Sequence, residues 1–599
     1  MSSRVRLPLR WFTFFFVCIG SIRLWEIFYA PSGFSFLGTC VVLCHITCVA
    51  LGLTLLRFSS RRLSLVALAA LSILYLASEH HFFVQGAYLT SRELVHYSVF
   101  SPQLFHGYWS NIYWPVLIAA LCVLGASLAL FCFQLPFERQ LPAAPTLKHR
   151  TTSGVVTLTF FGTYIHLSSG PLATFCLPLL YALLPLPSNA SETFLQQPFL
   201  TSSVFPSADY QTPRKVSAGN EKLNVILIHL ESTGDLSGRD DGASFVTSRD
   251  RLARTGLSFT NAYAPAPHTG KSIFASQTGR YGPAKVSNPI NTLSRERHEC
   301  ITNNFKKAGY RTGFFAANYF HFYGIARLKE VCDYDQMSDA RQLGKTDPTY
   351  INGLGTDEEA LFTQALKWMD ESKQPFFITL QTVLPHWPYT APPSWSSPAV
   401  SKEDRLQQYR NSLSYVDHAL NRFLDELEKR SLIDNTVIVL FGDHGEAFSE
   451  HPNNLIHGAE LYEENVRIPL IISNPKLIPE ASSTNAVASL VDLPPTLFDI
   501  FGMPWDPGRF DGVSLFGAPP NRMVFMVSDM LGDKYGLRDG DFKFIESPAV
   551  KNSASLFNLR EDPKESKNLS SLSADRRDFY SKAIESWVNH TRRHDPQAK

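Results

Sequence analysis

The chain has 599 residues, with 55 Lys and Arg against 54 Asp and Glu, and a formal net charge of +1. This length exceeds one ordinary domain, so two or more units are expected. The balanced charge argues against nucleic acid as the main partner, because such proteins concentrate positive charge. The acidic residues are unevenly distributed, and nearly all of them lie beyond position 220.

The first 187 residues predict an α-helical transmembrane domain of about five spans. A span needs about 20 apolar residues, and the candidate segments are 11–28, 35–56, 63–80, 113–133 and one starting near Ser153. Basic clusters lie before the first span, between the second and third, and between the fourth and fifth. Five spans place all of them on one side, which the positive-inside rule makes cytoplasmic.

A six-span alternative stays open. The charge-free stretch 151–191 is 41 residues long, enough for two short helices, which would leave the rest of the chain in the cytoplasm. Pro178, Pro185 and Pro187 interrupt its second half, and proline breaks helices. This favours one span followed by an interfacial segment. We therefore expect a multi-pass inner or plasma membrane protein whose polar part faces the outer, periplasmic or extracellular, side.

Residues 188–221 are rich in Ser, Pro, Thr and Gln without periodicity, which is typical of a linker. Beyond them, short apolar runs recur at 224–230, 312–316, 376–381, 436–441 and 468–473, with helical patterns that include 358–372 and 406–431. Buried strands alternating with helices predict an α/β fold with a mostly parallel sheet and helices on both faces. Ligands in such folds gather at the carboxyl ends of the strands.

Chemically useful side chains follow two of these strands. Glu231 comes directly after the first run, and Asp443-His444 follows the run that begins at 436, between Gly442 and Gly445. A carboxylate and an imidazole in one turn can aim an oxygen and a nitrogen ligand at the same divalent metal. The pair therefore predicts part of a metal site.

A third element surrounds Thr269. We expect a short helix over 271–278 that ends at Gly279, with Thr269 at or just before its N-terminus, where free amides favour a phosphate or sulfate group. Taken alone, this threonine would be read as an N-cap. Its hydroxyl becomes a useful nucleophile only if its pKa is lowered, and coordination to a metal would do that.

Together these motifs resemble the sulfatase branch of the alkaline phosphatase superfamily. They are Leu230-Glu231-Ser232, the segments 269–280 and 442–446, and the terminal motif 556–563. The resemblance covers roughly residues 222–570, which it implies are an α/β sulfatase-like catalytic domain, followed by a C-terminal helix and tail over 571–599. Five spans ahead of such a domain are similar to the phosphoethanolamine transferases and the lipoteichoic acid synthases.

The nucleophile position separates this chain from true sulfatases. Those enzymes oxidise Cys or Ser to formylglycine, with Pro and Arg following, whereas this chain has Thr269, Lys271 and Ile273 there. Threonine cannot give that aldehyde. The membrane transferases do use threonine, with a serine three residues on, as Ser272 is here.

The resemblance also implies a ligand set and a metal. The ligands would be Glu231, Thr269, Asp443 and His444, around one divalent cation. Three oxygens and one nitrogen suit zinc or manganese; zinc is favoured, and a second metal is left open.

Further residues are expected at the site on the same grounds. His386 resembles the transferases' histidine near the substrate phosphate. His457, thirteen residues after His444, matches another active-site histidine, for phosphate contact, a second metal or protonation of the leaving oxygen. Lys271 would either offset phosphate charge or be a solvated lysine at the helix end. Three other histidines are assigned no role: His229, His268 and His451.

The resemblance implies double displacement: Thr269 takes a headgroup from a phospholipid donor in the membrane, and the phosphothreonine passes it to an extracytoplasmic glycan or lipid. The headgroup is open between phosphoethanolamine and phosphoglycerol. Tyr323 keeps the aromatic residue of the lipoteichoic acid synthases' phosphoglycerol motif, but no Arg stands at the expected step. Phosphoethanolamine transferases have several cysteine pairs, whereas the polar part here has Cys300 and Cys332, and whether these are bonded is also open.

Three alternative functions make different demands on the sequence. A hydrolase of sulfate or phosphate esters would use the same site residues, with water as the acceptor. A non-catalytic lipid sensor would be favoured by a broken ligand set, and the set is intact. A transporter is disfavoured, because the membrane part is short and nearly free of ionisable residues in mid-span.

Overall fold

The computed structural model describes residues 202–592, apart from gaps at 206–209, 212, 220, 236–246, 285, 287, 296–297, 321, 348–349, 351, 396–403, 453, 530–532, 549 and 551–552. The chain divides into Met1–Asn189 and Ala190–Lys599, and the described residues belong to the second unit. The predicted spans lie outside the described residues, so the transmembrane domain stays a prediction. Within the described ranges, no helix combines the length and the apolar character needed to cross a bilayer.

The central sheet is built around β1 (Asn224–Leu230). β1 pairs in parallel with β5 (Phe376–Gln381) on one side and with β6 (Thr436–Gly442) on the other. β3 (Arg311–Ala316) and β4 (Gln336–Ser338) continue the parallel part beyond β5. Every residue of β1, β5 and β6 is buried, as continuous apolar runs in a sheet covered on both faces require.

Beyond β6 the sheet becomes largely antiparallel. β8 (Leu470–Ser473) pairs antiparallel with β6 and with β2 (Gly256–Tyr263), and β2 also pairs with β7 (Arg467–Ile468) and β9 (Ser482–Ser489). The single strand predicted over 468–473 is wrong, because the run divides into β7 and β8 at Pro469. Proline has no N–H to donate to a ladder.

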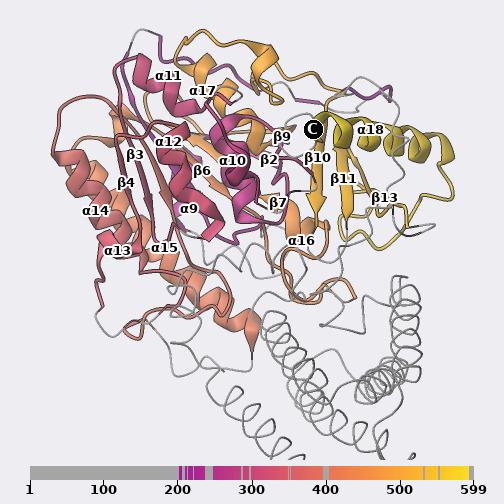
Figure 1. Cartoon of the computed structure of the whole chain (residues 1–599), viewed down its shortest axis with the longest axis horizontal. Coiled ribbons are helices and arrows are strands. Elements are labelled where there is room, and N and C mark those ends of the chain that lie inside the picture. The colour runs from indigo at the N-terminus through magenta and orange to yellow at the C-terminus, as the bar shows by residue number, and fades with distance from the viewer. Residues whose placement is uncertain are drawn as a thin grey trace, which may run out of the picture. The chain divides into compact units, whose positions relative to one another are not determined.

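Helices cover both faces, as predicted (Figure 1). Ile226 and Ile228 of β1 pack in the cluster that includes α14 (Glu358–Asp370) and α15 (Arg405–Lys429). Val225 and Leu227 face the opposite cluster, which includes α10 (Thr269–Thr278), α11 (Ile301–Lys307) and α17 (Leu493–Ile500). Successive side chains of a strand point to opposite faces, so one strand contributes to both layers.

The remaining helices lie around this core. Their bounds are α9 (Thr247–Arg254), α12 (Leu328–Val331), α13 (Ala340–Leu343) and α16 (Glu463–Val466). A disulfide joins Cys300, at the start of α11, to Cys332, just after α12. The pairing that the sequence left open is therefore present.

A second, antiparallel sheet follows the first. Its strands are β10 (Met523–Ser528), β11 (Lys534–Asp539), β12 (Phe542–Glu546) and β13 (Ser555–Asn558). The helix α18 (Ala574–Arg592) lies beside them (Figure 1, yellow). Its Trp587 is fully buried and stacks on Phe525 of β10 with ring centroids 5.3 Å apart, so this sheet and α18 share one core.

Candidate metal and active site

The site is built where β1 and β6 end side by side. Leu230 pairs with Gly442 in the parallel ladder, so Glu231 and Asp443 leave the sheet next to each other. The Asp443 N–H donates to the Leu230 carbonyl oxygen at 3.0 Å, and the Ser232 N–H donates to Asp443 Oδ1 at 2.7 Å. The two strand ends thus hold each other in place.

The glycines that flank Asp443-His444 allow close backbone packing. A Cβ on Gly442 would lie 1.9 Å from the Thr233 carbonyl oxygen, and one on Gly445 would lie 2.0 Å from the Glu464 carbonyl oxygen. Any side chain would force both neighbours apart. The Gly-Asp-His-Gly pattern is therefore a packing requirement of the turn as well as a marker of ligands.

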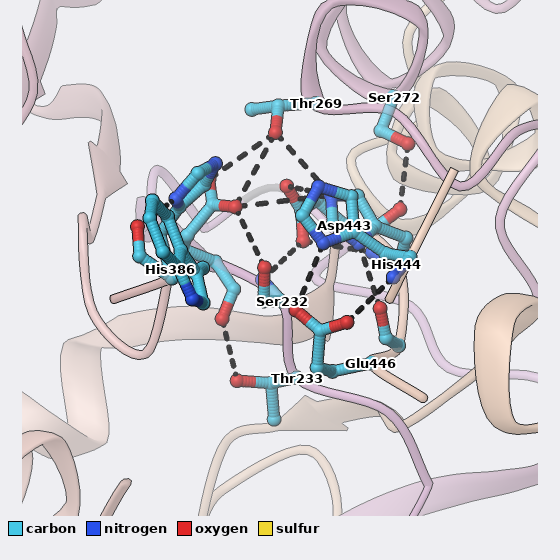
Figure 2. Close-up of polar contacts among 12 residues, drawn as sticks. Ser232, Thr233, Thr269, Ser272, His386, Asp443, His444 and Glu446 are labelled. Atoms are coloured by element: carbon cyan, nitrogen blue, oxygen red, sulfur yellow. Dashed lines mark hydrogen bonds and ion pairs between the residues drawn. The ribbon is translucent and has the colours of Figure 1, made fainter. Parts of the chain in front are cut away.

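Thr269 reaches this turn from the first residue of α10. The helix begins at Thr269, follows His268 in extended conformation, and ends at Gly279 with φ of 63°. The Thr269 hydroxyl lies 3.2 Å from Glu231 Oε2 and 3.4 Å from His444 Nε2, and Figure 2 shows it pointing toward the cluster. The Ser272 hydroxyl donates to the Asp443 carbonyl oxygen at 2.6 Å, which ties α10 to the turn.

The donor set fits a divalent cation. Ligand atoms of Glu231, Asp443 and His444 lie within 4.8 Å of one another, and all three residues are buried. Asp443 Oδ2 is buried without a hydrogen-bond partner, which is costly unless something else satisfies it. Burial and the nearby Asp443 carboxylate raise the pKa of Glu231 well above its usual range. Two adjacent buried carboxylates indicate a place for positive charge.

His444 is oriented to be a ligand. Its Nδ1 lies 2.8 Å from the Gly445 carbonyl oxygen, which can only accept a hydrogen bond, so Nδ1 carries the proton. The Nε2 lone pair then faces Glu231 Oε1 at 3.7 Å and Asp443 Oδ2 at 3.4 Å. Such a second contact sets the tautomer of metal-binding histidines.

Two further predicted histidines lie against this cluster. The His457 ring stacks on the His444 ring with centroids 4.5 Å apart, and the His386 ring is 5.4 Å from that of His457. His457 Nδ1 is 2.9 Å from Glu446 Oε2. Burial disfavours the Glu446 carboxylate, but His457 lowers its pKa to about 2.

Glu446 was not among the predicted site residues, although it stands in the same motif. A carboxylate two residues from a metal ligand, followed by a histidine eleven residues later, was the signal available. His229 was also left unassigned, and its Nε2 lies 3.8 Å from Asp443 Oδ2. Side chains two residues apart in an extended chain point to the same side. The position of His229 two residues before Glu231 was therefore a signal that it faces the metal cluster.

Lys271 and Tyr323 lie near the start of α10. The Lys271 side chain is 3% exposed, and its Nζ is 3.2 Å from Asp529 Oδ1. The solvated alternative is therefore wrong, whereas charge offset stays a prediction. Tyr323 packs edge-on against His268 at 5.0 Å, and a Cβ on Gly270 would lie 3.2 Å from Tyr323 Cβ. The predicted aromatic residue thus borders the segment that carries Thr269.

The other two unassigned histidines have structural surroundings. His451 Nδ1 lies 2.7 Å from Glu464 Oε1, and its ring stacks on Tyr462 at 3.7 Å. His268 precedes α10, and burial lowers its pKa to about 3. It is neutral near pH 7 and packs against Tyr323.

Comparisons with known proteins show what the chain is similar to. Residues 223–503 match the family described as Sulfatase. Lipoteichoic acid synthase 1 of Bacillus subtilis is 25% identical over 355 residues, which cover 55% of this chain and 54% of that protein. A sulfatase of Formosa agariphila is 26% identical over 371 residues, covering 48% of this chain and 71% of that protein. The chain thus spans about half the length of the lipoteichoic acid synthases it matches.

Solved structures show the same fold. A protein in the alkaline phosphatase superfamily from Vibrio parahaemolyticus aligns with a TM-score of 0.52 at 20% identity, covering 63% of this chain and 88% of that one. The lipoteichoic acid synthase LtaP from Listeria monocytogenes aligns with a TM-score of 0.51 at 18% identity, covering 63% and 94%. Residues 223–503 thus match the Sulfatase family, and this part of the chain resembles sulfatase-superfamily enzymes, the lipoteichoic acid synthases among them.

Proposed function

We propose that this protein is a membrane-anchored, metal-dependent phosphotransferase that moves a phospholipid headgroup through a phosphothreonine to an extracytoplasmic glycan or lipid. The observation that carries the proposal is the placement of Thr269. Its hydroxyl is buried at the start of a ten-residue helix, 3.2 Å from Glu231 and 3.4 Å from His444. A structural N-cap would bond to its own helix, whereas this hydroxyl faces two predicted ligands.

The metal would be held by Glu231, Asp443, His444 and the Thr269 hydroxyl. When bound, a divalent cation supplies Lewis-acid stabilisation of the phosphoryl oxygens and lowers the pKa of a coordinated hydroxyl. Zinc and manganese both suit this donor set. Zinc remains our first choice, because the set combines an imidazole with carboxylates in a buried pocket.

The reaction then consists of two successive displacements at phosphorus, in which the chain's own residues have different roles. In the first, Thr269 Oγ1 loses its proton and bonds to phosphorus, the bond to the diacylglycerol oxygen breaks, and that oxygen takes up a proton. His386 and His457, whose rings lie 5.4 Å apart beside the cluster, would carry this proton, and Glu446 holds the His457 ring. In the second, an acceptor hydroxyl loses its proton and bonds to phosphorus, the bond from phosphorus to Thr269 Oγ1 breaks, and Oγ1 takes up a proton to restore the threonine hydroxyl. The N-terminus of α10 favours the anionic group in both steps.

The similarity to lipoteichoic acid synthases favours phosphoglycerol over phosphoethanolamine. In either case the donor would be a phospholipid. Membrane anchoring would favour the reaction, because it holds the active site close to a donor in the bilayer. The catalytic domain would face the outer side of the inner or plasma membrane. We expect no nucleic-acid partner.

The test uses the full chain, purified in detergent and returned to vesicles that contain fluorescent phosphatidylglycerol or phosphatidylethanolamine. We expect release of labelled diacylglycerol from one of the lipids, and its loss in Thr269→Ala. Thr269→Ser is the matched control, since it keeps a hydroxyl. Peptide mass spectrometry should find a phosphorylated Thr269 carrying the transferred group. Release from neither lipid, or equal release by Thr269→Ala, would reject the proposal.

Hydrolysis of sulfate or phosphate esters is the second candidate, because a sulfatase matches over 71% of its own length. It predicts turnover of 4-nitrophenyl sulfate or phosphate with water as the acceptor. Rapid turnover of these esters without an alcohol acceptor, together with no lipid cleavage, would favour it. A lipid sensor is disfavoured by the intact cluster of Glu231, Asp443 and His444.

A further inference from the structure

Glu358 is a buried carboxylic acid outside the metal cluster. It is the first residue of α14, its side chain is 0% exposed, and the helix packs in the core through Leu361 and Ala365. Glu358 Oε1 accepts hydrogen bonds from the Val383 N–H at 2.9 Å and the Leu384 N–H at 2.8 Å. Its other oxygen, Oε2, has no hydrogen-bond partner. Burying a carboxyl group costs free energy, and the hydrogen bonds of this one go to the backbone of a single loop.

That loop leads from β5 to His386. The His386 N–H donates to the Val383 carbonyl oxygen at 3.1 Å, and the Tyr389 N–H donates to the His386 carbonyl oxygen at 2.9 Å. Holding the amides of Val383 and Leu384 therefore fixes the turn that begins at Val383 and ends at His386. Pro385 and Pro388 on either side of the histidine reduce its conformational freedom further.

The loop has a second tie, to the metal-ligand segment. The Thr382 hydroxyl donates to the Leu384 carbonyl oxygen at 3.0 Å and accepts the Glu231 N–H at 2.9 Å. Leu384 is therefore held by its N–H from Glu358 and by its carbonyl from Thr382. The Thr382 hydroxyl therefore links the backbone of Glu231, a predicted ligand, to the backbone of Leu384, two residues before His386.

The result is a defined direction for the imidazole. His386 Nδ1 lies 2.7 Å from the Trp387 carbonyl oxygen, so Nδ1 carries the proton and Nε2 is the free ring atom. The ring lies 5.4 Å from His457, which itself stacks on His444. A small displacement of the loop would move Nε2 relative to Thr269, and misplacements of about 1 Å can cost about a hundredfold in rate.

We propose that Glu358 is a positioning residue for His386, because its carboxyl group clamps the turn 383–386 from a rigid helix. The role in turnover rests on the proposed function, whereas the clamp itself can be tested without any substrate. Hydrogen exchange followed by mass spectrometry on the full chain in detergent measures the clamp directly. Glu358→Ala should raise exchange about tenfold or more in peptides that cover 382–389. Peptides from β1 and β6 should be unchanged.

Glu359→Ala is the matched control. Glu359 neighbours Glu358 on the same helix, but its carboxylate pairs with Arg422 at 2.6 Å on the surface. It should leave exchange over 382–389 unchanged. Equal protection of this loop in Glu358→Ala and in the wild type would overturn the clamp, whether or not the enzyme cleaves lipids.

The catalytic consequence is tested with a double-mutant cycle on diacylglycerol release. Glu358→Ala should lower kcat about tenfold or more with little change in KM or bound metal, as loss of supporting residues does elsewhere. In a His386→Ala background it should change kcat less than about twofold, because it acts only through that imidazole. Multiplicative losses, or loss of bound metal, would overturn the positioning role.

A second pair of variants covers the case in which Glu358→Ala does not fold. Thr382→Val removes the other tie at almost constant volume, and Thr382→Ser restores its hydroxyl. Thr382→Val should loosen the same loop and lower kcat, and Thr382→Ser should recover both. Recovery of neither, or a wild-type loop in Thr382→Val, would contradict the clamp.

Discussion

The Ser272 hydroxyl donates a hydrogen bond to the backbone carbonyl oxygen of Asp443 at 2.6 Å, and both residues are fully buried. This bond joins the helix that carries Thr269 to the turn that carries two predicted metal ligands. The serine three residues after the threonine therefore helps to hold Thr269 beside the predicted ligands.

Ser272→Ala should separate α10 from the metal-site turn. We expect a loss of about 1 kcal/mol in unfolding free energy and about tenfold weaker metal binding, because residues that support ligands have effects of this size. Ser276→Ala is the control, since that buried hydroxyl donates to Ile273 within the same helix at 3.2 Å. Isothermal titration of the metal-free protein measures both affinities. Equal affinities for the two variants would contradict the bridging role.

Gly445→Ala should destabilise the protein by about 3 kcal/mol, as overpacking a buried site does. The added Cβ would lie 2.0 Å from the Glu464 carbonyl oxygen, and backbone cannot rotate away as a side chain can. Gly517→Ala is the matched control, because a Cβ there meets nothing within 4 Å. Denaturant unfolding followed by tryptophan fluorescence gives both values. A change below about 1 kcal/mol for Gly445→Ala would show that the turn can open.

Removing the metal should expose the cost of the buried carboxylates. We expect chelation to lower the melting temperature of the wild-type chain and to abolish diacylglycerol release, with zinc or manganese restoring both. Glu231→Gln should reduce metal binding strongly. Without metal it should melt at or above the wild type, because one of two adjacent buried carboxylates becomes neutral. If the metal-free Glu231→Gln variant melts well below the metal-free wild type, the two adjacent carboxylates do not destabilise the metal-free protein.

Glu358 should make stability depend on pH. Burial raises its pKa from 4.5 to about 8, so the folded state keeps a proton that the unfolded state releases. The contribution is fully present below about pH 4.5 and falls as pH rises to about 8, by about 1.4 kcal/mol for each unit. Glu358→Gln cannot titrate, and the difference in unfolding free energy between it and the wild type should change with that slope. A constant difference from pH 5 to 8 would contradict the raised pKa.

Much of the fold was predictable because its core strands are continuous apolar runs. β1 and β5 begin and end where the sequence predicts, and β3 and β6 differ by one residue. The run at 468–473 is two strands because Pro469 interrupts it: β7 pairs with β2 alone, whereas β8 pairs with both β2 and β6. A run of apolar residues indicates that a segment is buried. It does not indicate which strand that segment pairs with.

The sequence by itself determined which side chains could form a metal site, because Glu231, Thr269 and Asp443-His444 each stand at the end of a strand or the start of a helix. Only the tertiary structure decided their distances and their support. Lys271 pairs with Asp529, His457 with Glu446, and Glu358 with the loop before His386. These partners are between 11 and 258 residues apart, and a sequence pattern can nominate such residues but does not show which of them folding brings into contact.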